Sequence, residues 1–111
     1  LAAGAAAVPL GLPILHLEGG HRTAGAVDDA IRHAVTKLAA LHFTAAEPYR
    51  QRILQMGEAP ERVFTVGSTA VDTLKAIGEA RASDIEALAG LDVSRGFLLA
   101  TFHPETLGER S

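Results

Sequence analysis

Residues 16–37 are rich in side chains that can move a proton or stabilise a charge. Glu18 follows a short apolar run, and Asp28 and Asp29 stand side by side further along the chain. The glycine-rich loop between them contains His21. Carboxylates and histidines are the usual groups in general acid–base catalysis. Together with the arginines of this segment, they predict acid–base chemistry on an anionic substrate.

The apolar pattern indicates which elements would position these side chains. Residues 14–17 are short, apolar and β-favouring, which is typical of a strand buried in a parallel sheet. A helix follows, and we expect Asp28 or Asp29 to cap it. Its apolar stripe consists of Ile31, Ala34, Val35, Leu38 and Ala39. Ligands of α/β proteins bind at the carboxyl ends of parallel strands, where Glu18 is expected to lie.

The rest of the chain alternates between strand-like and helix-like segments. Thr44 and Glu47 have the spacing of a capping box, and Ser83 is a second expected helix cap. This alternation predicts an α/β fold with a doubly wound parallel sheet, whose last strand opens a second domain. Strands are expected at 41–43, 63–66 and 97–102. Helices are expected at 1–7, from the capping box at 44–47 to about 56, from about 70 onward and near 83–89, and a polar linker at 90–96.

Composition excludes several classes of protein. The 111 residues carry a net charge of −3, which offers no basic surface for nucleic acid. The absence of cysteine excludes a disulfide scaffold and thiolate metal sites. Residues 1–17 are apolar, but they lack the basic start of a signal peptide and are interrupted by glycine and proline. We therefore expect no membrane segment.

Each candidate residue also has a structural interpretation. Glu18 is either a tuned acid or base or a loop glutamate that pairs with Arg22. Arg32, one helical turn after Asp28, either pairs with that acid or reaches a phosphate. Gly19 and Gly20 either let backbone amides approach a phosphate or serve a tight turn.

The histidines are likewise weighed between a functional and a structural role. His103 follows the expected strand 97–102. It either donates to a pyrophosphate or shuttles a proton, or it is a structural residue of a turn. His42 lies within the expected strand 41–43 and is interpreted as structural. His21, His33 and His42 do not have the spacing of metal ligands, so we expect no metal site.

Several motifs of this sequence resemble those of the UDP-N-acetylglucosamine 2-epimerase family, and they occur in the family's order. The string from Val27 to His33, Val-Asp-Asp-Ala-Ile-Arg-His, and the string Thr-Phe-His-Pro at 101–104 are similar to its hydrolysing branch. Further similarity lies in His-Leu-Glu-Gly-Gly at 16–20, Thr-Lys-Leu at 36–38, Leu-His-Phe at 41–43 and Arg-Val-Phe-Thr-Val-Gly at 62–67.

The resemblance implies two Rossmann-like domains with the active site between them, as in glycosyltransferase-B enzymes. Residues 1–89 would be the C-terminal part of the first domain, 90–96 the linker and 97–111 the start of the second. It also implies the hydrolysis of UDP-N-acetylglucosamine to N-acetylmannosamine and UDP. A close 2,4-diacetamido relative of this substrate would give its own free 2-epimer and UDP in the same way. The alternatives are a non-hydrolysing 2-epimerase and a non-catalytic nucleotide-sugar-binding module.

Roles follow from the resemblance residue by residue. Glu18 and Asp28 would be the catalytic acid–base pair, with Asp29 as the alternative candidate, and His103 would lie beside the leaving phosphate. Substrate contacts would come from Gly19, Gly20, His21 and Arg32, although His21 stands where many hydrolysing members have an acid. No metal or redox cofactor is implied. The family often forms homo-oligomers, and a cytoplasmic location is expected because nucleotide sugars are cytosolic.

Overall fold

A computed structural model describes residues 1–102 and 105–107 of the chain. The elements are α1 (Ala2–Ala7), η1 (Val8–Leu10), β1 (Leu15–Leu17), α2 (Val27–Leu38), β2 (Leu41–Thr44), α3 (Glu47–Gln55), η2 (Pro60–Arg62), β3 (Val63–Thr65), α4 (Thr69–Ile77) and α5 (Ala82–Ala89). The predicted α/β class is confirmed. Among these residues no helix is long and apolar enough to span a membrane.

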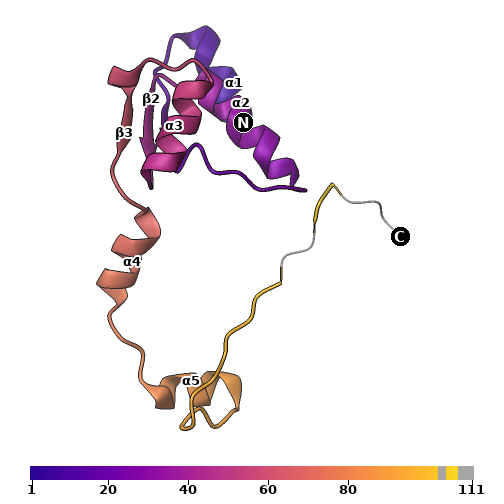
Figure 1. Cartoon of the computed structure of the whole chain (residues 1–111), viewed down its shortest axis with the longest axis vertical. Helices are drawn as coiled ribbons and strands as arrows, with labels where there is room; N and C mark the ends of the chain where they lie inside the picture. The colour runs from indigo at the N-terminus through magenta and orange to yellow at the C-terminus, as the bar shows by residue number, and fades with distance from the viewer. Residues whose placement is uncertain (103–104, 108–111) are drawn as a thin grey trace.

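The three strands form one parallel sheet in the order β1–β2–β3. Leu15 pairs with Leu41, and Phe43 pairs with Phe64, so the strands stay in step to their carboxyl ends. Figure 1 shows α2 and α3 packed beside this sheet, whereas α4 and α5 extend away from it. The sheet therefore brings the carboxyl ends of β1, β2 and β3 to the same edge.

The sheet and the helices α2 and α3 bury more polar than apolar side chains between them. Ile53 and Val63 are the buried apolar residues, and the buried polar residues are His16, Thr36, His42 and Thr44. Thr36 of α2 contacts His16 of β1, with Oγ1 3.2 Å from Nδ1. On the opposite face Leu15, Leu17 and Phe64 are exposed. The interpretation of His42 as a structural residue agrees with its complete burial.

Three predicted helix caps are wrong. The N-cap of α2 is Ala26, and Asp28 and Asp29 lie in the first turn instead. The helix α3 starts from Ala46, because Thr44 belongs to β2 and its hydroxyl donates to the carbonyl of Phe64 at 3.3 Å. Arg81, and not Ser83, precedes α5. Capping residues are fixed by where the preceding strand or turn ends, which side-chain type alone does not determine.

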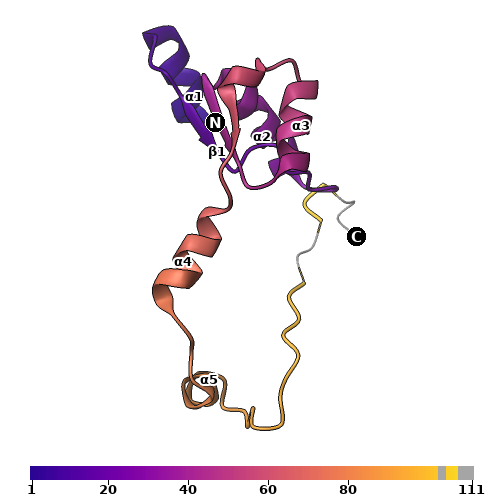
Figure 2. The same cartoon turned by 60° about the vertical axis from the view of Figure 1, so that its left-hand side comes forward.

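The expected strand at 97–102 is also wrong, because these residues form no strand. A parallel strand needs a neighbour for its N–H and C=O groups, and the sheet of the described residues consists of β1, β2 and β3 alone. Leu98 is 99% exposed. Both Figure 1 and Figure 2 show this segment running back from α5 as an extended chain, toward the loop before α2.

Candidate active site

Glu18 lies at the carboxyl end of β1, as predicted. Its N–H donates to the carbonyl of Phe43 at 2.9 Å, which extends the pairing of β1 with β2 by one residue. Its backbone then enters the left-handed region with φ 58°. For a residue other than glycine this conformation is uncommon and is frequent at functional sites. The turn directs the side chain toward the start of α4.

The carboxylate of Glu18 is held by two elements. Its Oε1 accepts hydrogen bonds from the backbone N–H of Thr69 at 2.9 Å and from the Thr69 hydroxyl at 3.3 Å. Its Oε2 lies 3.3 Å from Nε2 of His21. The pairing with Arg22 that was the structural alternative does not occur among the described residues. Glu18 is thus oriented by the helix start and by the loop.

Hydrogen bonding lowers the pKa of Glu18. The largest cause is the backbone N–H of Thr69, and the hydroxyls of Ser68 and Thr69 and the ring of His21 act in the same direction. Partial burial opposes them by raising the pKa. Hydrogen bonds to the charged form outweigh desolvation here because the side chain is still 32% exposed. Glu18 is therefore ionised near neutral pH, which is the form in which a carboxylate can accept a proton.

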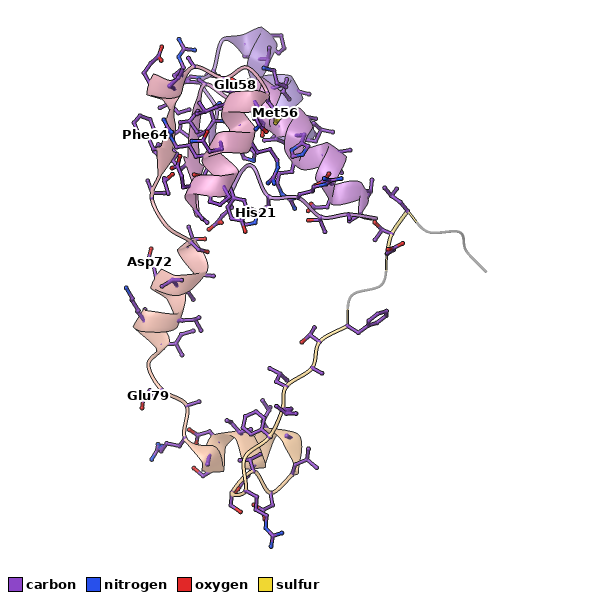
Figure 3. The ribbon with its side chains drawn as sticks, in the orientation of Figure 1. His21, Met56, Glu58, Phe64, Asp72 and Glu79 are labelled. Carbon is purple, nitrogen blue, oxygen red and sulfur yellow. The ribbon has the colours of Figure 1, made fainter. Side chains whose placement is uncertain are left out.

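His21 is fixed by an aromatic partner from α3. Its ring stacks on Tyr49, with centroids 3.8 Å apart and planes inclined by 25°. Figure 3 shows His21 at the end of the sheet that faces α4. The stacking orients the imidazole toward Glu18, so that His21 can donate a hydrogen bond to the carboxylate or exchange a proton with it.

Arg32 connects the loop to the acids of α2. Its Nη1 donates to the carbonyl of His21 at 3.1 Å and to Oγ1 of Thr23 at 3.2 Å. Its Nη2 forms an ion pair with Asp28, and Nη1 lies 3.7 Å from Oδ1 of Asp29. The arginine side chain is only 17% exposed. A guanidinium group suits this position because its five donors have fixed directions.

The two aspartates differ in environment. Oδ1 of Asp29 accepts a hydrogen bond from the N–H of Thr23 at 2.7 Å, and Oδ2 lies 3.8 Å from Nε2 of His33. The Thr23 N–H is the main cause that lowers the pKa of Asp29, with the charges of His33 and Arg32 adding to it. Asp28 contacts Arg32 and remains 63% exposed. Asp28 is therefore the more accessible of the two carboxylates.

Gly19 and Gly20 let the loop pass close to its neighbours. A side chain at Gly19 would lie 2.9 Å from the ring of His16. Gly20 has φ 83°, and a side chain there would collide with the carbonyl of Tyr49. Arg52 also donates a hydrogen bond to the carbonyl of Gly20. Close packing on His16 of β1 accounts for Gly19 and close packing on α3 accounts for Gly20, and their contact with a substrate phosphate stays a prediction.

The predicted catalytic residue His103 lies outside the described residues, and so does Pro104. The structure adds Thr69, Tyr49 and Thr23 as residues that hold the candidate site. The sequence signal for Thr69 was its position directly before the helix expected from residue 70 onward. Within the described part of the chain, no group of three or more His, Asp or Glu side chains has the arrangement of a metal site.

The fold and the site define an α/β protein with a parallel sheet and a cluster of carboxylates, histidine and arginine at its carboxyl edge. The family model for UDP-N-acetylglucosamine 2-epimerase matches residues 1–111. The chain belongs to the UDP-N-acetylglucosamine 2-epimerase family, as its motifs predicted.

Three curated relatives are similar over most of the chain. The GDP/UDP-N,N'-diacetylbacillosamine 2-epimerase (hydrolyzing) of Campylobacter jejuni is 39% identical over 90% of this chain and 26% of its own length. The UDP-N,N'-diacetylbacillosamine 2-epimerase (hydrolyzing) of Legionella pneumophila is 38% identical over 94% of this chain and 27% of its own. The polysialic acid biosynthesis protein P7 of Escherichia coli is 36% identical over 90% of this chain and 25% of its own length. The chain thus spans about a quarter of their length.

Proposed function

We propose that the chain is a segment of a hydrolysing nucleotide-sugar 2-epimerase. In this proposal residues 1–89 are the C-terminal part of a first Rossmann-like domain, 90–96 are a linker and 97–111 begin a second domain. The observation that carries the proposal is the continuous set of contacts from Glu18 through His21 and Arg32 to Asp28. These contacts group a base, a further acid and a cation at one edge of the sheet.

The proposed reaction needs such a group of residues. A carboxylate takes the proton from C2 of UDP-N-acetylglucosamine while the C1–O bond breaks and its electron pair leaves with UDP. Water then adds its oxygen to C1 of the 2-acetamidoglucal intermediate and loses a proton. C2 receives a proton on the opposite face, which gives N-acetylmannosamine. Removal and return of the proton on different faces require separate acid–base groups.

Roles are assigned from charge and accessibility. Glu18 is the first base, because its hydrogen bonds favour the ionised carboxylate. Asp28 is the second acid–base group, because it is exposed beside Arg32. Asp29 shapes the same helix start, and His103 is assigned to the leaving phosphate by the motif alone. Arg32 holds the acids in place and stabilises negative charge on the substrate.

The sugar has a second candidate. The relatives from Campylobacter jejuni and Legionella pneumophila are named for N,N'-diacetylbacillosamine, so a 2,4-diacetamido sugar on UDP is the alternative substrate. A cytoplasmic, homo-oligomeric enzyme that needs no redox cofactor is part of the same proposal. The non-hydrolysing reaction and a non-catalytic binding module are the rival functions.

The test uses the full-length protein in deuterated water, with each UDP sugar in turn and NMR detection of products. A free 2-epimeric sugar with deuterium at C2 and an equal amount of UDP would support the proposal. A UDP-linked epimer without free UDP would identify the non-hydrolysing reaction, and binding without exchange would identify a binding module.

A matched pair of variants tests the assigned base. Glu18→Gln preserves shape but removes the charge, and turnover should fall about a hundredfold or more. Glu61→Gln makes the same change at an exposed position in η2 and should leave turnover unchanged. Undiminished turnover of Glu18→Gln would rule out Glu18 as the base.

A further inference from the structure

The helix that carries Asp28, Asp29 and Arg32 begins without a cap of its own. Its N-cap, Ala26, has no side-chain oxygen, so it cannot satisfy the free N–H groups of the first turn. The two aspartates of that turn are engaged with Arg32 and with the N–H of Thr23. The first turn of α2 therefore has no capping acceptor from its own side chains.

The acceptor comes from the far end of the chain. The N–H of Val27 donates to Oγ1 of Thr106 at 2.9 Å across a separation of 79 residues. In return, the N–H groups of Thr106 and Leu107 donate to the carbonyl of Gly25 at 3.0 and 2.9 Å. Both cartoon views show the C-terminal segment reaching this loop (Figures 1 and 2). The three hydrogen bonds, here called the Thr106 clasp, join 25–27 to 106–107.

Gly25 is fitted to the clasp. Its φ is +73°, and a side chain there would lie 2.8 Å from Cδ and 2.9 Å from Cγ of Glu105. Glycine therefore serves the left-handed backbone that presents the carbonyl of residue 25 to Thr106 and Leu107, whereas the Glu105 side chain is flexible and exposed. Elsewhere in the described chain, Gly96 has a similar φ of +83° but no heavy atom near the same point.

We infer that Thr106 is a positioning residue that caps α2 through the Thr106 clasp and so sets the geometry of Asp28, Asp29 and Arg32. Because the threonine hydroxyl accepts the Val27 N–H, neither aspartate has to serve as the cap, and Asp28 stays open to a substrate. The clasp also joins residues 106–107, which follow His103 and Pro104 in the sequence, to the start of α2. The catalytic part of this inference rests on the proposed function.

The first test is residue-resolved hydrogen exchange on the full-length protein. Thr106→Val removes the acceptor, and exchange of the Val27 amide should become about fivefold faster, the change expected for loss of a typical cap. Exchange of the Thr23 amide should also rise, because Asp29 moves with the first turn. Thr106→Ser restores a hydroxyl and should restore both rates. Thr73→Val, which removes an exposed hydroxyl bonded within α4, is the control.

Steady-state kinetics then test the positioning role. With a UDP sugar that the wild type converts, Thr106→Val should lower kcat about tenfold with KM changed less than threefold, and Thr106→Ser should recover most of kcat. Val27 exchange unchanged in Thr106→Val would overturn the clasp. Faster Val27 exchange with Thr23 exchange and kcat unchanged would overturn the positioning role. If the wild type converts neither sugar, the proposed function fails, and the Thr23 rate alone decides the positioning role.

A second pair of variants does not touch the threonine. Gly25→Ala should accelerate exchange at Val27 and Leu107, because it strains the left-handed backbone of the residue whose carbonyl accepts the Thr106 and Leu107 N–H groups. Gly96→Ala imposes a comparable left-handed strain in open space and should leave both rates unchanged. Equal effects of the two substitutions on the Val27 rate would contradict the clasp.

Discussion

The carboxylate of Glu18 accepts a hydrogen bond from the backbone N–H of Thr69, 2.9 Å away and 51 residues later in the chain. Thr69 is the first residue of α4, and Ser68 is its N-cap. The N–H groups at a helix start have no partner within the helix and carry a partial positive charge. The carboxylate of Glu18 thus occupies the site of a capping group, which keeps it ionised and fixes its direction.

Thr69→Pro removes this hydrogen bond together with the one from the Thr69 hydroxyl, and should leave the backbone of the helix start unchanged. Proline fits the first position of a helix, and Ser68 already has the extended backbone that precedes proline. The backbone N–H of Thr69 is the main cause of the lowered pKa of Glu18, so the pKa should rise toward its usual 4.5. The acidic limb of kcat/KM against pH should move to higher pH.

The same substitution has a consequence for stability. Because folding lowers the pKa of Glu18, its contribution to the free energy of unfolding is present above pH 4.5 and disappears as the pH falls through the folded value. In Thr69→Pro this acid-dependent loss should shrink, as measured by urea unfolding at several pH values. Thr73→Val is the control, and an unchanged acidic limb in Thr69→Pro would contradict the assignment.

The local parts of the fold could be predicted from the sequence. The apolar runs predicted β1, β2 and β3 within one residue at their ends, and the stripe from Ile31 to Ala39 predicted the body of α2. Glu18 was expected at the carboxyl end of a strand for the same reason. These features depend on neighbouring residues and on hydrophobic period, which a single sequence contains.

The partners of the candidate site could not be predicted in this way. Thr69, Tyr49 and Thr106 reach Glu18, His21 and Val27 from distant parts of the chain, and side-chain type gives no indication of such pairs. The capping errors have a related cause, since Thr44 was drawn into β2 by its register with Thr65. Tertiary hydrogen bonding decided these positions over local preference.

Arg32→Lys should separate charge from geometry. Lysine preserves the positive charge but cannot donate at once to the His21 carbonyl, the Thr23 hydroxyl and the Asp28 carboxylate. We expect kcat/KM to fall about ten- to hundredfold, the factor that corresponds to one lost hydrogen bond to a charged group. Arg62→Lys, at an exposed position in η2, is the matched control. Equal kcat/KM values for the two variants would show that charge alone is sufficient at Arg32.

Gly20→Ala should destabilise the loop that carries His21. The new side chain meets the backbone of Tyr49, including its carbonyl carbon at 2.8 Å, and φ is +83°. Backbone atoms of α3 cannot move aside, so crowding adds to left-handed strain and should cost about 3 kcal/mol. Gly57→Ala, with φ +90° and open space, should cost about 1 kcal/mol. Urea unfolding of both variants measures the difference, and equal costs would show that the approach to Tyr49 is unimportant.

The buried histidines predict sensitivity to acid. Burial is the main cause that lowers the pKa of both His16 and His42, although Glu58 opposes it at His42. Nε2 of His42 lies 3.5 Å from Oε2 of Glu58, and within the described residues neither ring nitrogen has a well-aligned hydrogen bond. Oε1 of Glu58 binds Lys37 at 2.5 Å, and Figure 3 shows Glu58 at the end of the sheet away from His21. The acid response of His42 is therefore separate from the candidate site, whereas the ring of His16 lies against Gly19.

The sign of the effect follows from proton uptake. The unfolded chain protonates these histidines near their usual pKa of 6.5, whereas the folded chain keeps them neutral to lower pH. The free energy of unfolding should therefore fall as the pH drops below 6.5, until the folded pKa is reached. His42→Leu removes one of the two groups and leaves no unpaired ring nitrogen, so its urea midpoint should fall less between about pH 7.5 and about pH 5. His33→Leu, a partly exposed position on α2, is the control, and an unchanged pH dependence in His42→Leu would contradict the role given to His42.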